Sequence, residues 1–267
     1  MDKQHIKKTS NALYKKLYKS ITAATANFNI NNIHQCRVHY KKLRAFLKLV
    51  SQQQNGINKI SCSRKIKKLY SLLGKIRDLQ LQQQRLRSIP KFPQQLNWYR
   101  YILYRQINHL KNELSLQFKE KKLLESKQKT DVALPEKLPA GHIRNFLLQK
   151  QIGIHALIAT KHFSDTAIHA IRKQLKDLFY IVSLHPLSGK QLFVNTKWET
   201  KKRAYFDNLL DKLGIFQDSC TAIALLHTHR LNNPGQTGLL LLKKIQQTWA
   251  IEKNALKKLL TAELKNF

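Results

Sequence analysis

The chain has 267 residues and a formal net charge of +34 at pH 7, with 49 Lys and Arg against 15 Asp and Glu. Its 42% hydrophobic residues supply a core, which excludes a disordered basic tail, and its length suits two fused helical bundles better than one small bundle. So large a cationic excess repels itself and favours a polyanionic partner, such as nucleic acid, an anionic membrane or polyphosphate.

Eight long helices are predicted in chain order, joined by short segments rich in glycine, proline or asparagine. The chain has only 8 Gly and 6 Pro, and almost no stretch alternates apolar and polar residues as a strand would. The predicted helices cover about residues 6–26, 34–54, 59–87, 94–127, 142–162, 165–185, 196–231 and 236–267. Ser164 is the expected N-cap of the sixth helix. The predicted fold class is therefore all-α.

The predicted helix over residues 94–127 carries aromatic residues, including Trp98 and Tyr101, at helical spacing among aliphatic residues. Nucleic-acid stacking platforms need aromatic side chains that are exposed in a groove. Because the spacing here is that of an apolar helix face, we expect these aromatic side chains to lie in the core.

The second predicted helix carries two stripes along its length. The basic stripe consists of His34, Arg37, Lys41, Arg44 and Lys48, which fall within an arc of roughly 80° on an α-helix. The apolar stripe, roughly 120° away, consists of Cys36, Tyr40, Leu43, Leu47 and Val50. Residues 34–48 contain no acid, so we do not expect ion pairs between these cations and other residues of the same stretch. We expect the apolar stripe to face the core and the basic stripe to bind an anion, since Arg and Lys suit phosphate oxygens.

The same pattern returns downstream. His169, Arg172 and Lys176 repeat the spacing of the first stripe, and each stripe is followed by a related marker, LGKIRD at residues 73–78 and LGIFQD at residues 213–218. Two markers in the same order, at nearly the same separation, indicate an internal duplication.

The duplication predicts a first half over residues 1–128, a linker over 129–141 and a second half over 142–267. Gly74 lies inside a predicted helix, where glycine costs about 1 kcal/mol relative to alanine. We therefore expect another helix to approach closely at this position.

The motif H-x-x-R-x-x-x-K-K-L-R followed by L-G-x-x-R-D, present in full in the first half and altered in the second, resembles the CHAD domain, the conserved histidine α-helical domain. The resemblance covers nearly the whole chain. It implies two four-helix bundles related by a pseudo-two-fold axis, with a basic cleft or pore where they meet. It also implies that the chain binds inorganic polyphosphate and has no catalytic activity of its own.

The second half departs from this motif. Asp177, Phe179 and Gln217 stand where the first half has Lys or Arg, so they are not carried over as phosphate ligands. The candidate polyphosphate-binding residues are His34, Arg37, Lys41, Lys42, Arg44, Lys48, Arg64, Lys68, Lys75, His169, Arg172, Lys173 and Lys176. Spacing alone leaves the two histidines equally open as structural residues, and the resemblance places them at the anion site. Since most of these cations lie in the first half, we expect that half to hold the polymer.

Two other functions remain open on the sequence. The charge also suits a nucleic-acid-binding protein, although no helix-turn-helix, zinc-finger or RNP signature occurs. The chain could also be an accessory subunit of a polyphosphate-metabolising enzyme, because CHAD domains are often fused to a CYTH triphosphatase domain, whose E-x-E-x-K opening is absent here. No P-loop and no cluster of carboxylates occurs, so we expect no enzyme activity, cofactor or metal site. Asp78 and Asp218 are expected to orient nearby cations.

The sequence also bears on location. Three widely spaced cysteines, Cys36, Cys62 and Cys220, form no disulfide or zinc pattern, which suits a reducing cytoplasm. The N-terminus lacks an apolar signal region, and the longest aliphatic run, Leu239 to Leu242, is too short to span a membrane. We therefore expect a cytoplasmic protein without a membrane partner, and the resemblance allows association with polyphosphate granules.

Overall fold

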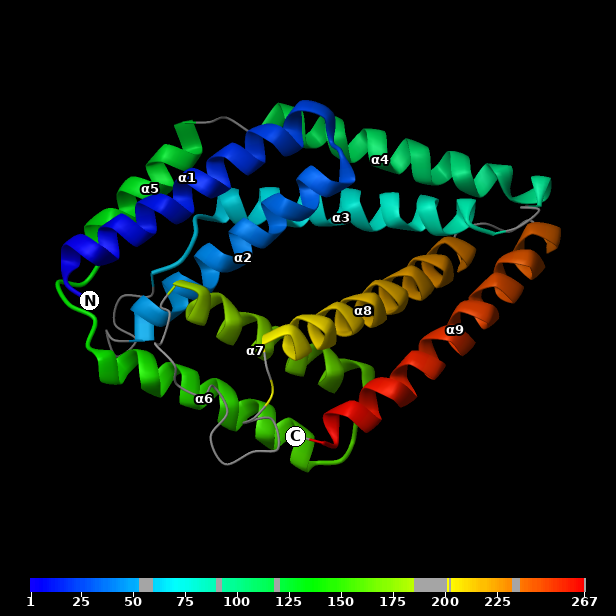
Figure 1. Cartoon of the computed structure of the whole chain (residues 1–267). Helices are drawn as coiled ribbons and strands as arrows, with labels where there is room; N and C mark the ends of the chain where they lie inside the picture. Colours follow the sequence, from blue (N-terminus) through cyan, green and yellow to red (C-terminus); the bar gives the residue numbers. More distant parts are fainter. Residues whose placement is uncertain are drawn as a thin grey trace. The chain divides into compact units, whose positions relative to one another are not determined.

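The computed structural model describes residues 1–52, 60–89, 93–117, 121–184, 201, 203–231 and 236–266 (Figure 1). Within these residues it contains nine α-helices, one short 3-10 helix and no strand. The elements are α1 (Lys3–Asn27), α2 (Ile30–Gln52), α3 (Arg64–Arg87), η1 (Gln94–Leu96), α4 (Asn97–Gln117), α5 (Lys121–Ala133), α6 (Ala140–Ala159), α7 (Asp165–Leu184), α8 (Arg203–Leu231) and α9 (Gln236–Leu264). The all-α prediction is confirmed.

The predicted N-cap of the sixth helix is also confirmed, because the Ala167 backbone N–H donates to Ser164 Oγ at 3.1 Å. The predicted beginning of the seventh helix at residue 196 lies outside the described residues. The predicted end of the sixth helix at residue 185, before Pro186 and Gly189, and the predicted turn between the last two helices at residues 232–235 also lie outside the described residues.

The helix predicted over residues 94–127 is wrong in its extent. The structure has two helices there, α4 and α5, and α5 continues into the predicted linker as far as Ala133. The loss of periodicity from Ser126 onward, with Pro135, Pro139 and Gly141, made this segment look like a loop. Ser126 and Thr130 are nevertheless buried against α1, which lies beside α5 (Figure 1). Tyr14 Oη of α1 lies 2.8 Å from Thr130 Oγ1, so a buried hydrogen bond satisfies the polar face of α5.

The described chain forms two compact units, each built from three segments. Unit 1 combines Met1–Arg77, Gln106–Lys150 and Asp177–Pro186, and unit 2 combines Asp78–Arg105, Gln151–Lys176 and Leu187–Phe267. The helices α3, α4, α6 and α7 each contribute to both units. These units are defined by which residues pack together in space, and they differ from the halves predicted along the sequence, 1–128 and 142–267. The internal duplication therefore stays a prediction.

The core of unit 1 forms where α1 packs on α2. All five residues of the predicted apolar stripe of α2 are buried, as are Leu13, Leu17 and Ile21 on the facing side of α1. Burying one such aliphatic side chain contributes about 1.5–3 kcal/mol. This packing fixes the rotation of α2 about its axis, so the basic stripe lies on a different side of the helix from the core.

In unit 2, α8 packs against α9, and Leu213 and Phe216 of α8 are buried along with Trp249 of α9. The aromatic side chains of α4 are divided between core and solvent. Tyr99 is fully buried, whereas Tyr101 is 60% exposed, so the prediction that Tyr101 lies in the core is wrong. Helical spacing located an apolar face, but that face is centred on Tyr99 and continues through Leu103.

Candidate functional site

The basic stripe of α2 lies at the surface of unit 1. His34 and Lys48 are exposed, and Arg37, Lys41 and Arg44 are half-buried. From His34 to Lys48 the stripe extends about 21 Å along the helix, at 1.5 Å per residue. Its cations therefore present a row of positive charge beside a packed core.

Arg37 has a structural role in this stripe. Its Nη1 donates to the Tyr70 carbonyl oxygen at 2.9 Å, and its guanidinium carbon lies 4.4 Å from the centre of the Tyr70 ring. A Cβ added to Gly74 would lie 2.1 Å from Arg37 Nη1. The close approach expected at Gly74 therefore comes from the Arg37 side chain, which needs the space that a glycine leaves.

The second stripe contains a related pair in unit 2. A Cβ added to Gly214 would lie 3.6 Å from Arg172 Nη2, which is an ordinary van der Waals contact. Each unit thus holds an arginine of the repeated motif beside the glycine of the Leu-Gly marker that follows it. The first pair is tightly packed, and the second leaves room for a methyl group.

A buried carboxylate joins the end of the basic stripe to α6. Asp177 of α7 has only 6% of its side chain exposed, and its Oδ2 accepts a hydrogen bond from Lys48 Nζ at 2.8 Å. Arg44 Nη2 and Lys150 Nζ each lie 3.9 Å from a carboxylate oxygen of Asp177. The stripe thus has an acidic partner after all, supplied by another helix. Asp177, which the sequence marks only as a lost phosphate ligand, is a counterion for three cations.

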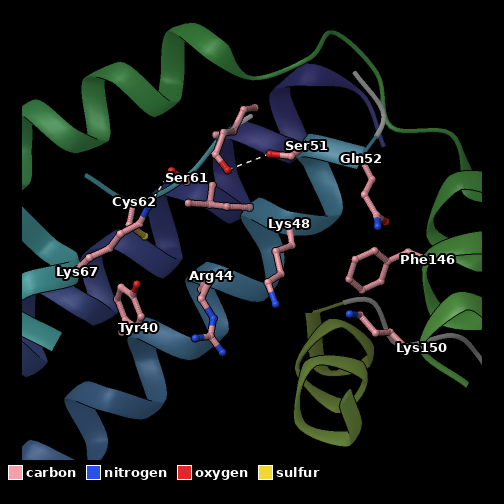
Figure 2. Close-up of a pocket in the computed structure, with 12 residues that line it drawn as sticks. Tyr40, Arg44, Lys48, Ser51, Gln52, Ser61, Cys62, Lys67, Phe146 and Lys150 are labelled. Carbon is pink, nitrogen blue, oxygen red and sulfur yellow. Dashed lines mark hydrogen bonds between the residues drawn. The ribbon is translucent and has the colours of Figure 1, made fainter. Parts of the chain in front are cut away.

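These cations line a pocket of about 800 Å³ in unit 1 (Figure 2). The pocket is lined by Tyr40, Arg44, Leu47, Lys48, Ser51, Gln52, Ile60, Ser61, Cys62, Lys67, Phe146 and Lys150. In Figure 2 the side chains of Lys48 and Lys150 extend towards one another from α2 and α6. Four cations, Arg44, Lys48, Lys67 and Lys150, therefore surround one volume that also has apolar walls.

The sequence did not point to two of these cations. Lys67 directly precedes the candidate Lys68, and the helical spacing that selected Lys68 placed Lys67 on a neighbouring face of α3. Lys150 lies on α6, far from both motifs in sequence, and no local pattern marks it. Only the tertiary structure brings Lys150 to Asp177.

The pocket changes the acidity of its own residues. Burial lowers the pKa of Lys150, the Asp177 carboxylate opposes this effect, and Lys48 and Arg44 add to it. Burial raises the pKa of Tyr40 to about 12 and that of the Cys62 thiol to about 11. Cys62 is therefore a protonated thiol at neutral pH, and the charge of the pocket comes from its cations.

The remaining candidates of unit 1 lie on α2 and α3. Arg64, Lys68 and Lys75 are exposed on α3, and Lys68 Nζ lies 3.3 Å from Glu113 Oε1 of α4. Lys42 Nζ lies 6.0 Å from the centre of the Tyr180 ring. Of the thirteen candidates, Arg44 and Lys48 line the pocket. The phosphate-binding role of all of them stays a prediction.

The candidates of the second stripe belong to unit 2. Lys173 is exposed on α7, and His169, Arg172 and Lys176 are half-buried. The marker residues Asp78 and Asp218 both line a smaller pocket of about 350 Å³ in the same unit. Their expected role of orienting nearby cations stays a prediction.

Among the described residues, no group of three or more His, Cys, Asp and Glu side chains is placed to hold a metal ion. None of the helices in the described part of the chain is long and apolar enough to cross a membrane.

Comparison with known proteins identifies a fold and a family. The family model described as "CHAD domain" matches residues 12–227. The structure is similar to the crystal structure of the CHAD domain from the plant Ricinus communis, with a TM-score of 0.73 and 16% sequence identity over 99% of this chain and 92% of that one. At this identity the structural likeness shows the fold alone. No curated protein matches the sequence.

Proposed function

Because the chain belongs to the CHAD domain family, we propose that it binds inorganic polyphosphate and catalyses no reaction itself. The observation that carries this proposal is the cluster of four cations around the pocket of unit 1, next to the row of cations on α2. A linear polyanion fits a linear row of cations, because successive phosphates can meet successive helical turns.

Charge balance favours an anionic ligand in this pocket. Arg44, Lys48, Lys67 and Lys150 supply four positive charges, and the adjacent Asp177 supplies one negative charge, which leaves an excess of three. Bringing like charges together is unfavourable, and burial already lowers the pKa of Lys150. A phosphate group would offset this repulsion, and Arg44 offers it a planar fork of donors.

The test measures polyphosphate binding by the whole chain over a range of salt concentrations. We expect the logarithm of the affinity to fall linearly with the logarithm of salt concentration, as counterions are released from the polymer. Replacing Lys48→Gln and Lys150→Gln together should weaken binding by about tenfold or more per lysine, since a charge-assisted contact contributes about 1.5–3 kcal/mol.

A matched control is Lys7→Gln with Lys8→Gln, two exposed lysines on α1 of the same unit. This variant loses the same formal charge away from the pocket. If both double variants lose the same affinity, the polymer responds to net charge alone and the proposed site is wrong. Binding that hardly changes with salt would also contradict the proposal. Circular dichroism should show that both variants fold.

A further inference from the structure

The N-terminal part of α4 carries an exposed surface whose chemistry differs from that of the phosphate site. We call it the α4 Tyr–Arg face, and it consists of Arg100, Tyr101, Tyr104 and Arg105. All four residues are exposed and belong to unit 2, and Tyr101 and Tyr104 are 60% and 57% exposed. Other large apolar side chains are also exposed in this protein, but here two aromatic rings lie on the same side of one helix between two arginines.

The face lies opposite the buried side of the helix. Tyr99 and Leu103 are fully buried, and at 100° per residue they point away from Tyr101 and Tyr104. The core therefore fixes the outward direction of the two rings. Tyr101 and Tyr104 are three residues apart, about 4.5 Å along the helix axis, so both rings lie on one side of α4.

Positive charge flanks both rings. The Arg105 guanidinium carbon lies 5.9 Å from the centre of the Tyr101 ring, within the range of a cation–π contact. Arg100 is one turn before Tyr104 on the same side of the helix. An aromatic ring beside an arginine offers a planar apolar surface and a phosphate contact within a few ångströms of each other.

We propose that the α4 Tyr–Arg face binds single-stranded nucleic acid, with bases stacking on Tyr101 and Tyr104 and with Arg100 and Arg105 contacting the phosphates. Single strands expose the flat faces of their bases, and stacking on aromatic side chains needs no particular sequence. The chain's net charge of +34 favours approach of any nucleic acid. This inference is independent of the polyphosphate proposal.

Polyphosphate itself does not explain this face. It has no planar group, so it could use the two arginines but would gain nothing from the tyrosine rings. A protein partner could use the rings, but two flanking arginines on a strongly basic chain favour a partner with regularly spaced negative charge. Single-stranded nucleic acid provides both features.

The test compares two ligands of equal charge. Labelled oligouridylate of about 12 nucleotides and an abasic ribose-phosphate oligomer of the same length are titrated with the whole chain by fluorescence anisotropy. We expect tighter binding of the oligouridylate. Tyr101→Ala with Tyr104→Ala should weaken oligouridylate binding by about 25-fold or more and leave abasic and polyphosphate binding within twofold.

Three further variants define the chemistry. Tyr101→Phe with Tyr104→Phe keeps the rings and should retain oligouridylate binding. Arg100→Gln with Arg105→Gln should lower the affinity for the oligouridylate and for the abasic oligomer by the same factor. Ile251→Ala with Leu259→Ala is a matched control, because it removes two exposed apolar side chains, 71% and 67% exposed, from α9 of the same unit.

Several results would overturn the proposal. The first is equal affinity of the unaltered chain for the oligouridylate and the abasic oligomer. The second is an equal loss of affinity for both ligands in the tyrosine-to-alanine variant. The third is a phenylalanine variant that binds the oligouridylate as weakly as the alanine variant does. A loss in the α9 control as large as that in the tyrosine variant would also contradict it. Selective loss of oligouridylate binding in the tyrosine-to-alanine variant alone would support base stacking.

Discussion

The helix α7 carries two carboxylates that each hold lysines, one in each unit, and the two sites differ in exposure and charge balance. In unit 1, Asp177 is almost fully buried and lies near Arg44, Lys48 and Lys150. In unit 2, Asp165 has 38% of its side chain exposed and accepts hydrogen bonds from two lysines of α9. Three cations thus surround Asp177, of which only Lys48 lies within 3 Å, whereas Asp165 holds two lysines, each on its own carboxylate oxygen.

Asp165 forms ion pairs with two lysines at once, one on each carboxylate oxygen. Lys253 Nζ lies 2.7 Å from its Oδ2 and Lys257 Nζ lies 2.6 Å from its Oδ1, so each oxygen has its own donor. Partial burial raises the pKa of Asp165, but the hydrogen bonds from the two lysines outweigh this effect and hold it below its usual value. These lysines are occupied in joining α9 to the beginning of α7.

Other cations of unit 2 are also paired with acids. Arg85 Nη2 lies 2.6 Å from Glu252 Oε2, and Lys212 Nζ lies 2.9 Å from Glu263 Oε2. Net charge alone is therefore a poor guide to an anion site. A cation with a close carboxylate partner, as Lys48 has in Asp177, must give up or share that contact before it can bind phosphate. Lys150 lies 3.9 Å from the same carboxylate and is held less closely, and the unit 1 pocket as a whole has an excess of three positive charges.

The largest expected effect tests this difference directly. Lys48→Gln with Lys150→Gln should weaken polyphosphate binding by about 100-fold or more, while Lys253→Gln with Lys257→Gln should weaken it only a few-fold through the loss of net charge. Isothermal titration with polyphosphate of one length measures both. Similar losses from the two pairs would mean that unit 2 contributes to the site as much as unit 1.

The second effect is on stability. Asp177→Asn leaves the cations around it without a counterion and should lower the free energy of unfolding by about 2 kcal/mol, between the ranges for exposed and buried ion pairs, because Asp177 is buried but Lys48 is 47% exposed. Asp165→Asn should cost about 1 kcal/mol, because its site is more exposed. Urea unfolding of both variants measures the difference. A polyphosphate-dependent recovery of stability in Asp177→Asn alone would show that the ligand replaces the carboxylate.

The sequence correctly predicted the features that depend on residues close to one another along the chain. Helical periodicity identified the apolar stripe of α2, and the N-cap at Ser164 was recognisable because capping is a local interaction. The unusual position of Gly74 signalled a close approach, although its cause, the Arg37 side chain, required the tertiary structure.

What depends on distant residues was missed. Lys150 and Asp177 meet Lys48 only after the chain has folded, so no spacing rule could assign Asp177 as a counterion. Tyr101 was misplaced for a different reason, since a helix with several apolar faces does not reveal which face is buried.

A smaller effect compares the two glycines of the Leu-Gly markers. Gly214→Ala should raise the free energy of unfolding by about 1 kcal/mol, because alanine favours the helix and its Cβ fits beside Arg172. Gly74→Ala should give no such gain, since its Cβ would displace Arg37 from the Tyr70 carbonyl. Thermal and urea unfolding of both variants measure the difference. Equal stabilisation would mean that Arg37 moves aside at no cost.

The smallest effect concerns one histidine in each unit. Burial lowers the pKa of His39 in unit 1, and Lys42 and Lys16 lower it further, whereas burial alone lowers the pKa of His229 in unit 2. Each folded-state pKa lies below the value of about 6.5 expected for the unfolded chain. The unfolded chain therefore binds protons more readily, and stability should fall as the pH is lowered through about 6.5 towards the folded-state values.

Added salt distinguishes the causes of the lowered pKa values of His39 and His229. Raising the ionic strength shortens the Debye length from about 10 Å at 0.1 M to about 3 Å at 1 M, which screens the repulsion from Lys42 and Lys16. The pKa of His39 should then rise towards 6.5, while that of His229, packed beside Tyr99, should stay low. Histidine NMR titrations at the two salt concentrations measure both values. If the pKa of His229 rose as much as that of His39, nearby charge and not burial would be lowering both values, and the contrast between the two histidine sites would fail.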